Sequence, residues 1–99
     1  MITEIVEIDV TPGSEAAFEA AVAEAAPLFQ AARGCHHLRL ERGLEELSRY
    51  RLFVSWETVH DHMIHFRESP AFARWRELAR PYFAAPPRME HVETVLNAF

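Results

Sequence analysis

Hydrophobic and polar residues alternate along four stretches of the chain, with the period of two that half-buried β-strands show. The first stretch covers residues 2–10, where one face carries Ile2, Val6, Ile8 and Val10. Residues 36–41 and 49–56 alternate in the same way, and the connection between them is short enough for a hairpin. Residues 88–96 alternate less regularly. We therefore expect four strands.

Two further segments carry apolar residues at helical spacing. In the first, Ser14 is a suitable N-cap, apolar positions recur through residue 32, and Gly34 stands where a C-terminal glycine cap belongs. The second begins with residues 58–66 and restarts at Ser69, an N-cap that is followed by a first-turn proline, Pro70. These patterns predict one helix after the first strand and a broken helical segment before the last strand.

The predicted order is β-α-β-β-α-β, the split βαβ plan of a ferredoxin-like α+β fold. It has one four-stranded antiparallel sheet with helices on one face. At 99 residues the chain has room for one hydrophobic core, so we expect a single domain over residues 1–99. Ile5 and Phe53 would point to the face without helices, which favours a homodimer in which a second sheet packs there. The alternative is that they are scattered surface residues.

Composition and net charge limit the classes of function that this protein can have. Hydrophobic residues make up 49% of the chain and charged residues 25%, which is typical of a soluble globular protein. Ten basic against fifteen acidic residues give a net charge of −5, which argues against nucleic-acid binding. The nearest basic cluster, Arg74, Arg76 and Arg80, is interleaved with Glu77 and is interpreted as a solvated helix face.

The sequence contains no apolar run of about 18 residues and no basic leader followed by an apolar stretch. We expect no membrane association and a cytoplasmic location. Cys35 is the only cysteine, so the chain can form neither an internal disulfide nor a thiolate zinc site.

Six histidines make metal binding the first chemistry to consider. His60, His62 and His65 lie close together, but on an α-helix only His62 and His65 would share a face. Their spacing is not a recognised zinc pattern, so structural or solvated histidines are the favoured interpretation and we expect no metal site.

His65 is the candidate with the clearest chemical role. Asp61 precedes it by four residues and could orient its ring on a helix. Trp56 leads into this helix, and Phe72 and Trp75 follow it, so His65 could be a titratable group in an apolar pocket between helix and sheet. From spacing alone, the favoured alternative is that the aromatic residues form the core and His65 is its polar edge.

Other candidates for a binding site come from the strands. His36 alternates with Leu38 and Leu40 and is expected to face the helices. His91 could reach the same cavity, although His91 and its neighbour Val92 compete for the interior face. The Tyr50 hydroxyl could bind a polar edge of a substrate, or Tyr50 could simply be a core aromatic residue.

The stretch 56–72 carries a motif. Trp56 and Glu57 are followed by His65 and then by Ser69, Pro70, Ala71 and Phe72. This resembles the W-E-x(7)-H-x(3)-S-P-x-F signature of the antibiotic biosynthesis monooxygenase family. The turn after the first strand and the helix behind it also fit the family, so the resemblance extends over essentially the whole chain.

The resemblance implies ferredoxin-like subunits that pair through their sheets as a dimeric α+β barrel, with a pocket in each subunit. It implies oxidation of a small electron-rich aromatic, phenol or quinol by dioxygen without a cofactor. Only Trp56 and His65 are carried over from the signature. His65 would be the base, oriented by Asp61. The expected pocket walls are Trp56, Phe72 and Trp75, and the expected substrate anchors are Tyr50, His36 and His91.

One departure from the family narrows the chemistry. Its haem-degrading members carry an asparagine in the first strand, where this chain has Val6, so haem degradation is disfavoured. The alternative to an oxygenase is a non-catalytic dimer of the same fold that binds a small ligand or has a purely structural role.

Overall fold

The predicted order of elements is confirmed by a computed structural model that describes residues 1–99. The strands are β1 (Ile2–Asp9), β2 (Cys35–Arg42), β3 (Arg49–Trp56) and β4 (Arg88–Val92). The helices are α1 (Glu15–Gln30), the π-helix η1 (Asp61–Phe66), α2 (Pro70–Ala79) and the short 3₁₀-helix η2 (Arg80–Tyr82).

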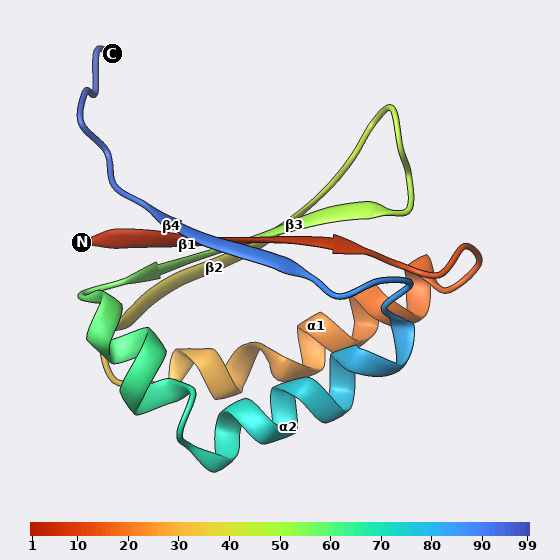
Figure 1. Cartoon of the computed structure of the whole chain (residues 1–99), viewed down its shortest axis with the longest axis horizontal. Helices are drawn as coiled ribbons and strands as arrows, with labels where there is room; N and C mark the ends of the chain where they lie inside the picture. Colours follow the sequence, from red (N-terminus) through yellow and green to blue (C-terminus); the bar gives the residue numbers. More distant parts are fainter.

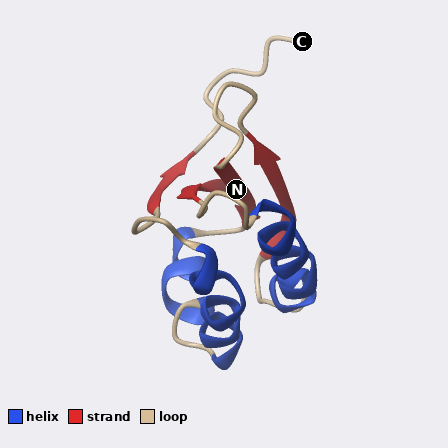
Figure 2. Ribbon diagram, turned by 90° about the vertical axis from the view of Figure 1, so that its right-hand side faces the viewer, coloured by secondary structure: helices blue, strands red, loops and turns tan.

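The four strands form one antiparallel sheet in the order β2-β3-β1-β4. Helices α1 and α2 lie side by side under one face of this sheet, and no element covers the other face (Figure 1). The view turned by 90° shows the same two layers, with both helices on one side of the strands (Figure 2). The ferredoxin-like α+β fold expected from the pattern is therefore confirmed.

The core lies between the sheet and the helices, where the alternation places the apolar side chains. The register pairs Val6 with Leu52 and Ile8 with Tyr50, so these side chains point to the helical face together. Each large side chain buried here contributes about 1.5–3 kcal/mol through apolar burial. The core comprises Ile8, Val10, Phe18, Val22, Ala25, Phe29, Tyr50, Leu52, Val54, Trp56, Phe66, Trp75 and Ala79.

Two local features of the strands differ from the sequence prediction. The pairing of β2 with β3 shifts register between Cys35 and His37, and this bulge turns His36 away from the helices. The last strand ends at Val92, so the predicted strand over 88–96 is too long. Residues 93–99 leave the sheet on the side away from the helices (Figure 1).

The open face of the sheet combines charged residues with one apolar pair. Ile5 lies directly opposite Phe53, and the Arg39 guanidinium sits 4.1 Å from the centre of the Phe53 ring. Beside them, the Glu7 carboxylate lies within 4 Å of the guanidinium groups of Arg49, Arg51 and Arg88. None of the helices combines the length and apolar character needed to cross a membrane.

Candidate active site

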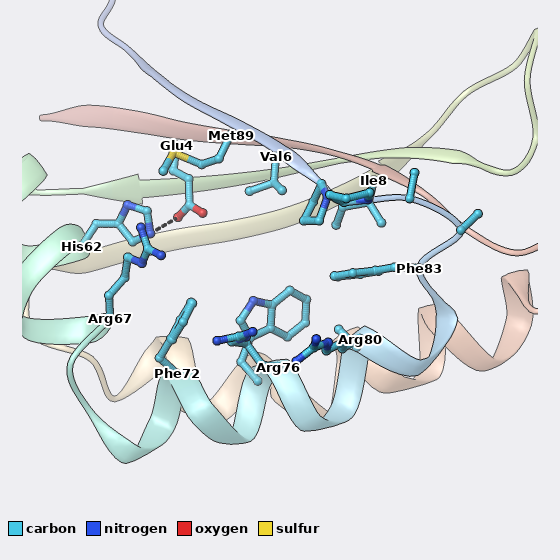
Figure 3. A pocket seen from close by; sticks show the side chains of 16 residues that line it. Glu4, Val6, Ile8, His62, Arg67, Phe72, Arg76, Arg80, Phe83 and Met89 are labelled. Atoms are coloured by element: carbon cyan, nitrogen blue, oxygen red, sulfur yellow. Dashed lines mark ion pairs between the residues drawn. The ribbon is translucent and has the colours of Figure 1, made fainter.

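A cavity of about 650 Å³ lies between the sheet and α2. Side chains from β1 and β4 form one wall and side chains from α2 form the other (Figure 3). Its 16 lining residues are Glu4, Val6, Ile8, His62, Arg67, Phe72, Trp75, Arg76, Ala79, Arg80, Phe83, Ala84, Ala85, Pro86, Pro87 and Met89. Nine of them are hydrophobic, so the few polar groups among them can fix the orientation of a ligand.

Glu4 is the one acidic residue in this lining. It is in phase with Ile2 and Val6 on β1, so the pleat turns it inward and leaves it 6% exposed. Its Oε1 accepts a hydrogen bond of 2.9 Å from Trp56 Nε1 on the neighbouring strand. The carboxylate points into the cavity (Figure 3). Oε2 makes no hydrogen bond to the protein and is free to meet a ligand.

Burial raises the pKa of Glu4 from 4.5 to about 7. The hydrogen bond from Trp56 and the positive charge of Arg67 both favour the carboxylate, but they offset only part of the cost of removing it from water. A carboxyl group with this pKa exchanges protons at neutral pH. This is the property that a general base at neutral pH needs.

His62 reaches the same place because η1 is a π-helix. The Arg67 amide donates to the His62 carbonyl, five residues earlier, at 3.0 Å. His62 is 3% exposed, and its ring stacks on Trp56 with the centroids 5.2 Å apart. Its Nε2 lies 3.3 Å from Glu4 Oε1, the contact dashed in Figure 3.

Burial lowers the pKa of His62 to about 4, and the charges of His91 and Arg67 act in the same direction. His62 is therefore neutral at pH 7, so its contact with Glu4 is not an ion pair at that pH. On its other side, His62 Nδ1 shares a hydrogen bond of 2.8 Å with Nε2 of His91. His62 thus lies between Glu4 and His91, in contact with both.

The prediction that His65 lies in this pocket is wrong. His65 is exposed and packs edge-on against His60, with the ring centroids 4.9 Å apart. The expected α-helical spacing would pair His62 with His65, but a π-helix brings residues five apart into register. In η1, His62 therefore faces the interior, and the His60–His65 pair faces outward.

Asp61 does not orient His65 as the spacing suggested. Its Oδ2 accepts from Thr58 Oγ1 at 3.0 Å, and its Oδ1 lies 3.6 Å from Arg33 Nε. The Thr58 hydroxyl also accepts from the Asp61 amide at 3.1 Å, which closes the first turn of the helical segment. Asp61 is buried and fixes the start of η1, away from the cavity.

The predicted aromatic residues are divided between pocket and core. Phe72 and Trp75 line the cavity. Trp56 is fully buried behind Glu4 and touches the site through its indole N–H. Tyr50 is also buried, but its hydroxyl donates to Glu19 at 2.5 Å, on the side of the sheet where α1 packs, and it does not line the cavity.

His36 and His91 are both predicted to reach the cavity from strands, but only His91 faces the interior. His36 does not face the interior, because the bulge in β2 exposes it and places its Nε2 2.6 Å from a Glu57 carboxylate oxygen. His91 lies opposite Glu4 in the register of β4 with β1, so it shares the inward face and reaches His62. Val92 points the other way.

Two residues at the centre of the site, Glu4 and His62, are absent from the predicted set. The alternation of residues 2–10 carried a signal for Glu4, because an acidic residue interrupts the apolar face between Ile2 and Val6. No comparable signal marked His62, whose inward position depends on the π-helix. No three histidine, cysteine, aspartate or glutamate side chains converge as a metal site would require.

The fold and the pocket define a ferredoxin-like protein with a buried acid–histidine pair facing a largely apolar cavity. Residues 1–78 match the sequence model of the family described as antibiotic biosynthesis monooxygenase. The uncharacterized protein YczJ of Bacillus subtilis strain 168 is 33% identical over 95 residues, which is 96% of this chain and 100% of YczJ. The chain belongs to the antibiotic biosynthesis monooxygenase family.

Solved structures give the same result. A Bordetella bronchiseptica protein named for this family is 53% identical, with a TM-score of 0.94 over 96% of this chain and 97% of its own. SnoaB from Streptomyces nogalater, a cofactor-independent oxygenase solved as a mutant, is 18% identical with a TM-score of 0.84 over 98% and 95% of the chains. The second likeness concerns the fold alone. Together with the family match, the first supports a monooxygenase-type role.

Proposed function

We propose that this protein is a cofactor-independent monooxygenase in which Glu4 removes a proton from a small electron-rich phenol or quinol. The observation that carries the proposal is a buried carboxylate whose pKa lies at about 7 and whose free oxygen opens onto an aromatic cavity. Family membership supports the reaction class, and SnoaB provides an example of an oxygenase of this fold without a cofactor.

The reaction needs no electron source besides the substrate. Glu4 takes one proton, and the substrate anion transfers an electron to dioxygen, giving a substrate radical and superoxide. These combine to form a carbon–oxygen bond, and the resulting peroxide anion takes a proton back. The carbon that carries the peroxide then loses its remaining hydrogen as a proton while the O–O bond breaks, which leaves the quinone carbonyl, and the released hydroxide and this proton form water. The net change is one substrate plus O₂ to one quinone plus H₂O, and dioxygen receives all four electrons from the substrate.

The neighbours of Glu4 support both protonation states that this cycle requires. When Glu4 is ionised, Trp56 donates a hydrogen bond to Oε1, His62 Nε2 lies 3.3 Å from the same oxygen, and Oε2 remains available for the substrate proton. When Glu4 is protonated, His62 Nε2 is the nearest ring nitrogen at 3.3 Å, and the hydrogen bond between His62 and His91 would extend a proton path toward the half-buried His91 at the sheet edge. The apolar residues of the lining would shield the substrate anion from part of the surrounding water.

Oxygen consumption by the purified, metal-stripped protein tests the proposal, with hydroquinones, naphthols and anthrones as substrates. We expect uptake with at least one of them, and a loss of about 10²-fold or more in Glu4→Gln, the range for removal of a general base. Gln keeps the shape of the side chain and an oxygen that can accept from Trp56, so the loss reports on the proton.

A second variant separates this assignment from the one made on sequence. If His65 is the base, His65→Ala abolishes turnover and Glu4→Gln retains it. The geometry favours the reverse, because His65 is exposed outside the cavity. Absence of uptake across the substrate panel would refute the oxygenase proposal and favour the non-catalytic ligand-binding dimer.

We also propose that the protein is a homodimer that pairs through the open faces of its sheets. The Ile5–Phe53 pair on that face supports this, as do the exposed apolar residues Val95, Leu96 and Phe99 of the C-terminal segment. Sedimentation velocity at micromolar concentration should give twice the mass of 11.4 kDa. A monomer would refute the pairing and leave the pocket unaffected.

A further inference from the structure

The arginines of this protein fall into two groups. All ten basic residues are arginines, and seven of them have a side-chain nitrogen within 4.0 Å of a carboxylate oxygen. The three without such a partner are Arg67, Arg76 and Arg80. These same three line the cavity, and none of the seven paired arginines does.

A shortage of acidic residues does not explain this division. The chain carries fifteen acidic residues against ten arginines, and exposed carboxylates such as Glu68 and Glu90 make no ion pair. Arg74, on the same helix as Arg76, does pair, with Glu77 at 3.2 Å and with Glu24 at 3.6 Å. The cavity is therefore a cationic site in a protein whose net charge is −5.

The three arginines are placed along the cavity. Arg67 lies at the end occupied by Glu4 and His62, and Arg80 lies toward the other end, near Phe83, with Arg76 between them (Figure 3). Arg76 and Arg80 are four residues apart, so they lie on one side of α2 and its continuation η2. Arg67 and Arg76 both approach the Phe72 ring, at 5.4 and 5.9 Å from its centroid.

We infer that the substrate of this site is an aromatic acid, with its reactive hydroxyl at Glu4 and a carboxylate held by Arg76 and Arg80. The aromatic rings of Phe72, Trp75 and Phe83 would contact the ring system. Guanidinium groups bind planar carboxylates through paired hydrogen bonds, and neither arginine has an internal partner to give up. The inference rests on the proposed function only for the role of Glu4, because binding of the anion does not require turnover.

Calorimetric titration under nitrogen tests this, with 2-naphthol and 6-hydroxy-2-naphthoate as probes. The two probes share a ring and a hydroxyl and differ in the carboxylate. We expect the naphthoate to bind about tenfold more tightly, the size of a charge-assisted hydrogen bond. The preference should disappear in the double variant Arg76→Gln/Arg80→Gln. The preference should survive in part in the double variant Arg76→Lys/Arg80→Lys. This variant keeps both positive charges but loses the planar guanidinium groups that bind a carboxylate through paired hydrogen bonds.

Arg74→Gln is the matched control, because Arg74 is on the same helix and already paired with carboxylates. It should leave both affinities unchanged. Equal binding of the two probes to the wild-type protein would overturn the inference. A preference that persists in the double glutamine variant, or no binding of either probe, would overturn it as well.

The outcome is separable from that of the proposed function. Anion preference without oxygen uptake would support the substrate class and refute the oxygenase. The opposite result is oxygen uptake with neutral naphthols that depends on Glu4 and is unchanged in the Arg76 and Arg80 variants. That result would support the oxygenase and overturn this inference.

Discussion

Glu4→Gln should make the folded protein more stable while it abolishes the proposed reaction. The carboxyl group has a pKa of 4.5 when exposed and of about 7 in the folded protein, because burial disfavours its charge. The folded state therefore holds the Glu4 proton more tightly than the unfolded state. This contribution to stability is complete below pH 4.5 and is lost as the pH rises through about 7.

The difference between the two pKa values corresponds to about 3 kcal/mol of unfolding free energy at pH 8. A glutamine carries no charge to desolvate and keeps an acceptor for Trp56, so Glu4→Gln should be about 3 kcal/mol more stable than the wild type at pH 8. At pH 4.5 most of this advantage disappears, because wild-type Glu4 is protonated there. The neutral state of His62 costs stability in acid, but both proteins share that cost.

Urea unfolding of both proteins at pH 4.5 and pH 8, at one fixed protein concentration, measures this difference. Glu68→Gln is the control, because Glu68 is exposed and makes no ion pair, and it should leave stability unchanged at both pH values. A Glu4→Gln effect of equal size at the two pH values would show that packing is responsible and would refute the ionisation argument. A loss of stability at pH 8 would refute it too.

Two further predictions follow from the same region. The rate of oxygen uptake should rise with pH through about 7 as Glu4 ionises, and in Trp56→Phe the rise should move to higher pH, because the carboxylate loses the indole hydrogen bond. An unmoved profile would show that another group controls the rate. Gly34→Ala should destabilise the fold by about 2 kcal/mol or more, measured by thermal unfolding. Gly34 has a φ of +77°, and an added Cβ would lie 2.3 Å from Asp61 Oδ2. Gly13→Ala, at φ +95° with open space around it, should cost less, and equal losses would contradict the steric argument.

The sheet and its helical face could be predicted from the sequence because a period of two fixes which side chains point inward. The same rule places Glu4 on the inner face between Ile2 and Val6, so the base proposed here was within reach of sequence reasoning. His91 required the structure, since its side is set by the pairing of β4 with β1.

The wrong predictions for His36 and His65 have a common physical origin. Each arises where the backbone departs by one residue from a regular strand or α-helical repeat. The bulge in β2 adds a residue between paired positions and turns His36 outward. The π-helix widens the turn and exchanges His65 for His62 on the inner side. Periodicity predicts side-chain direction only while the repeat holds, and single-residue irregularities leave little trace in the sequence.

The π-helix has a consequence for how such a site can arise or disappear. Removing a single residue from η1 would restore ordinary α-helical spacing over the same segment. His62 would then rotate away from the sheet, and Glu4 would lose its link to His91 while the rest of the core stayed in place. A one-codon insertion or deletion in η1 is thus enough to connect or disconnect the buried acid in this protein.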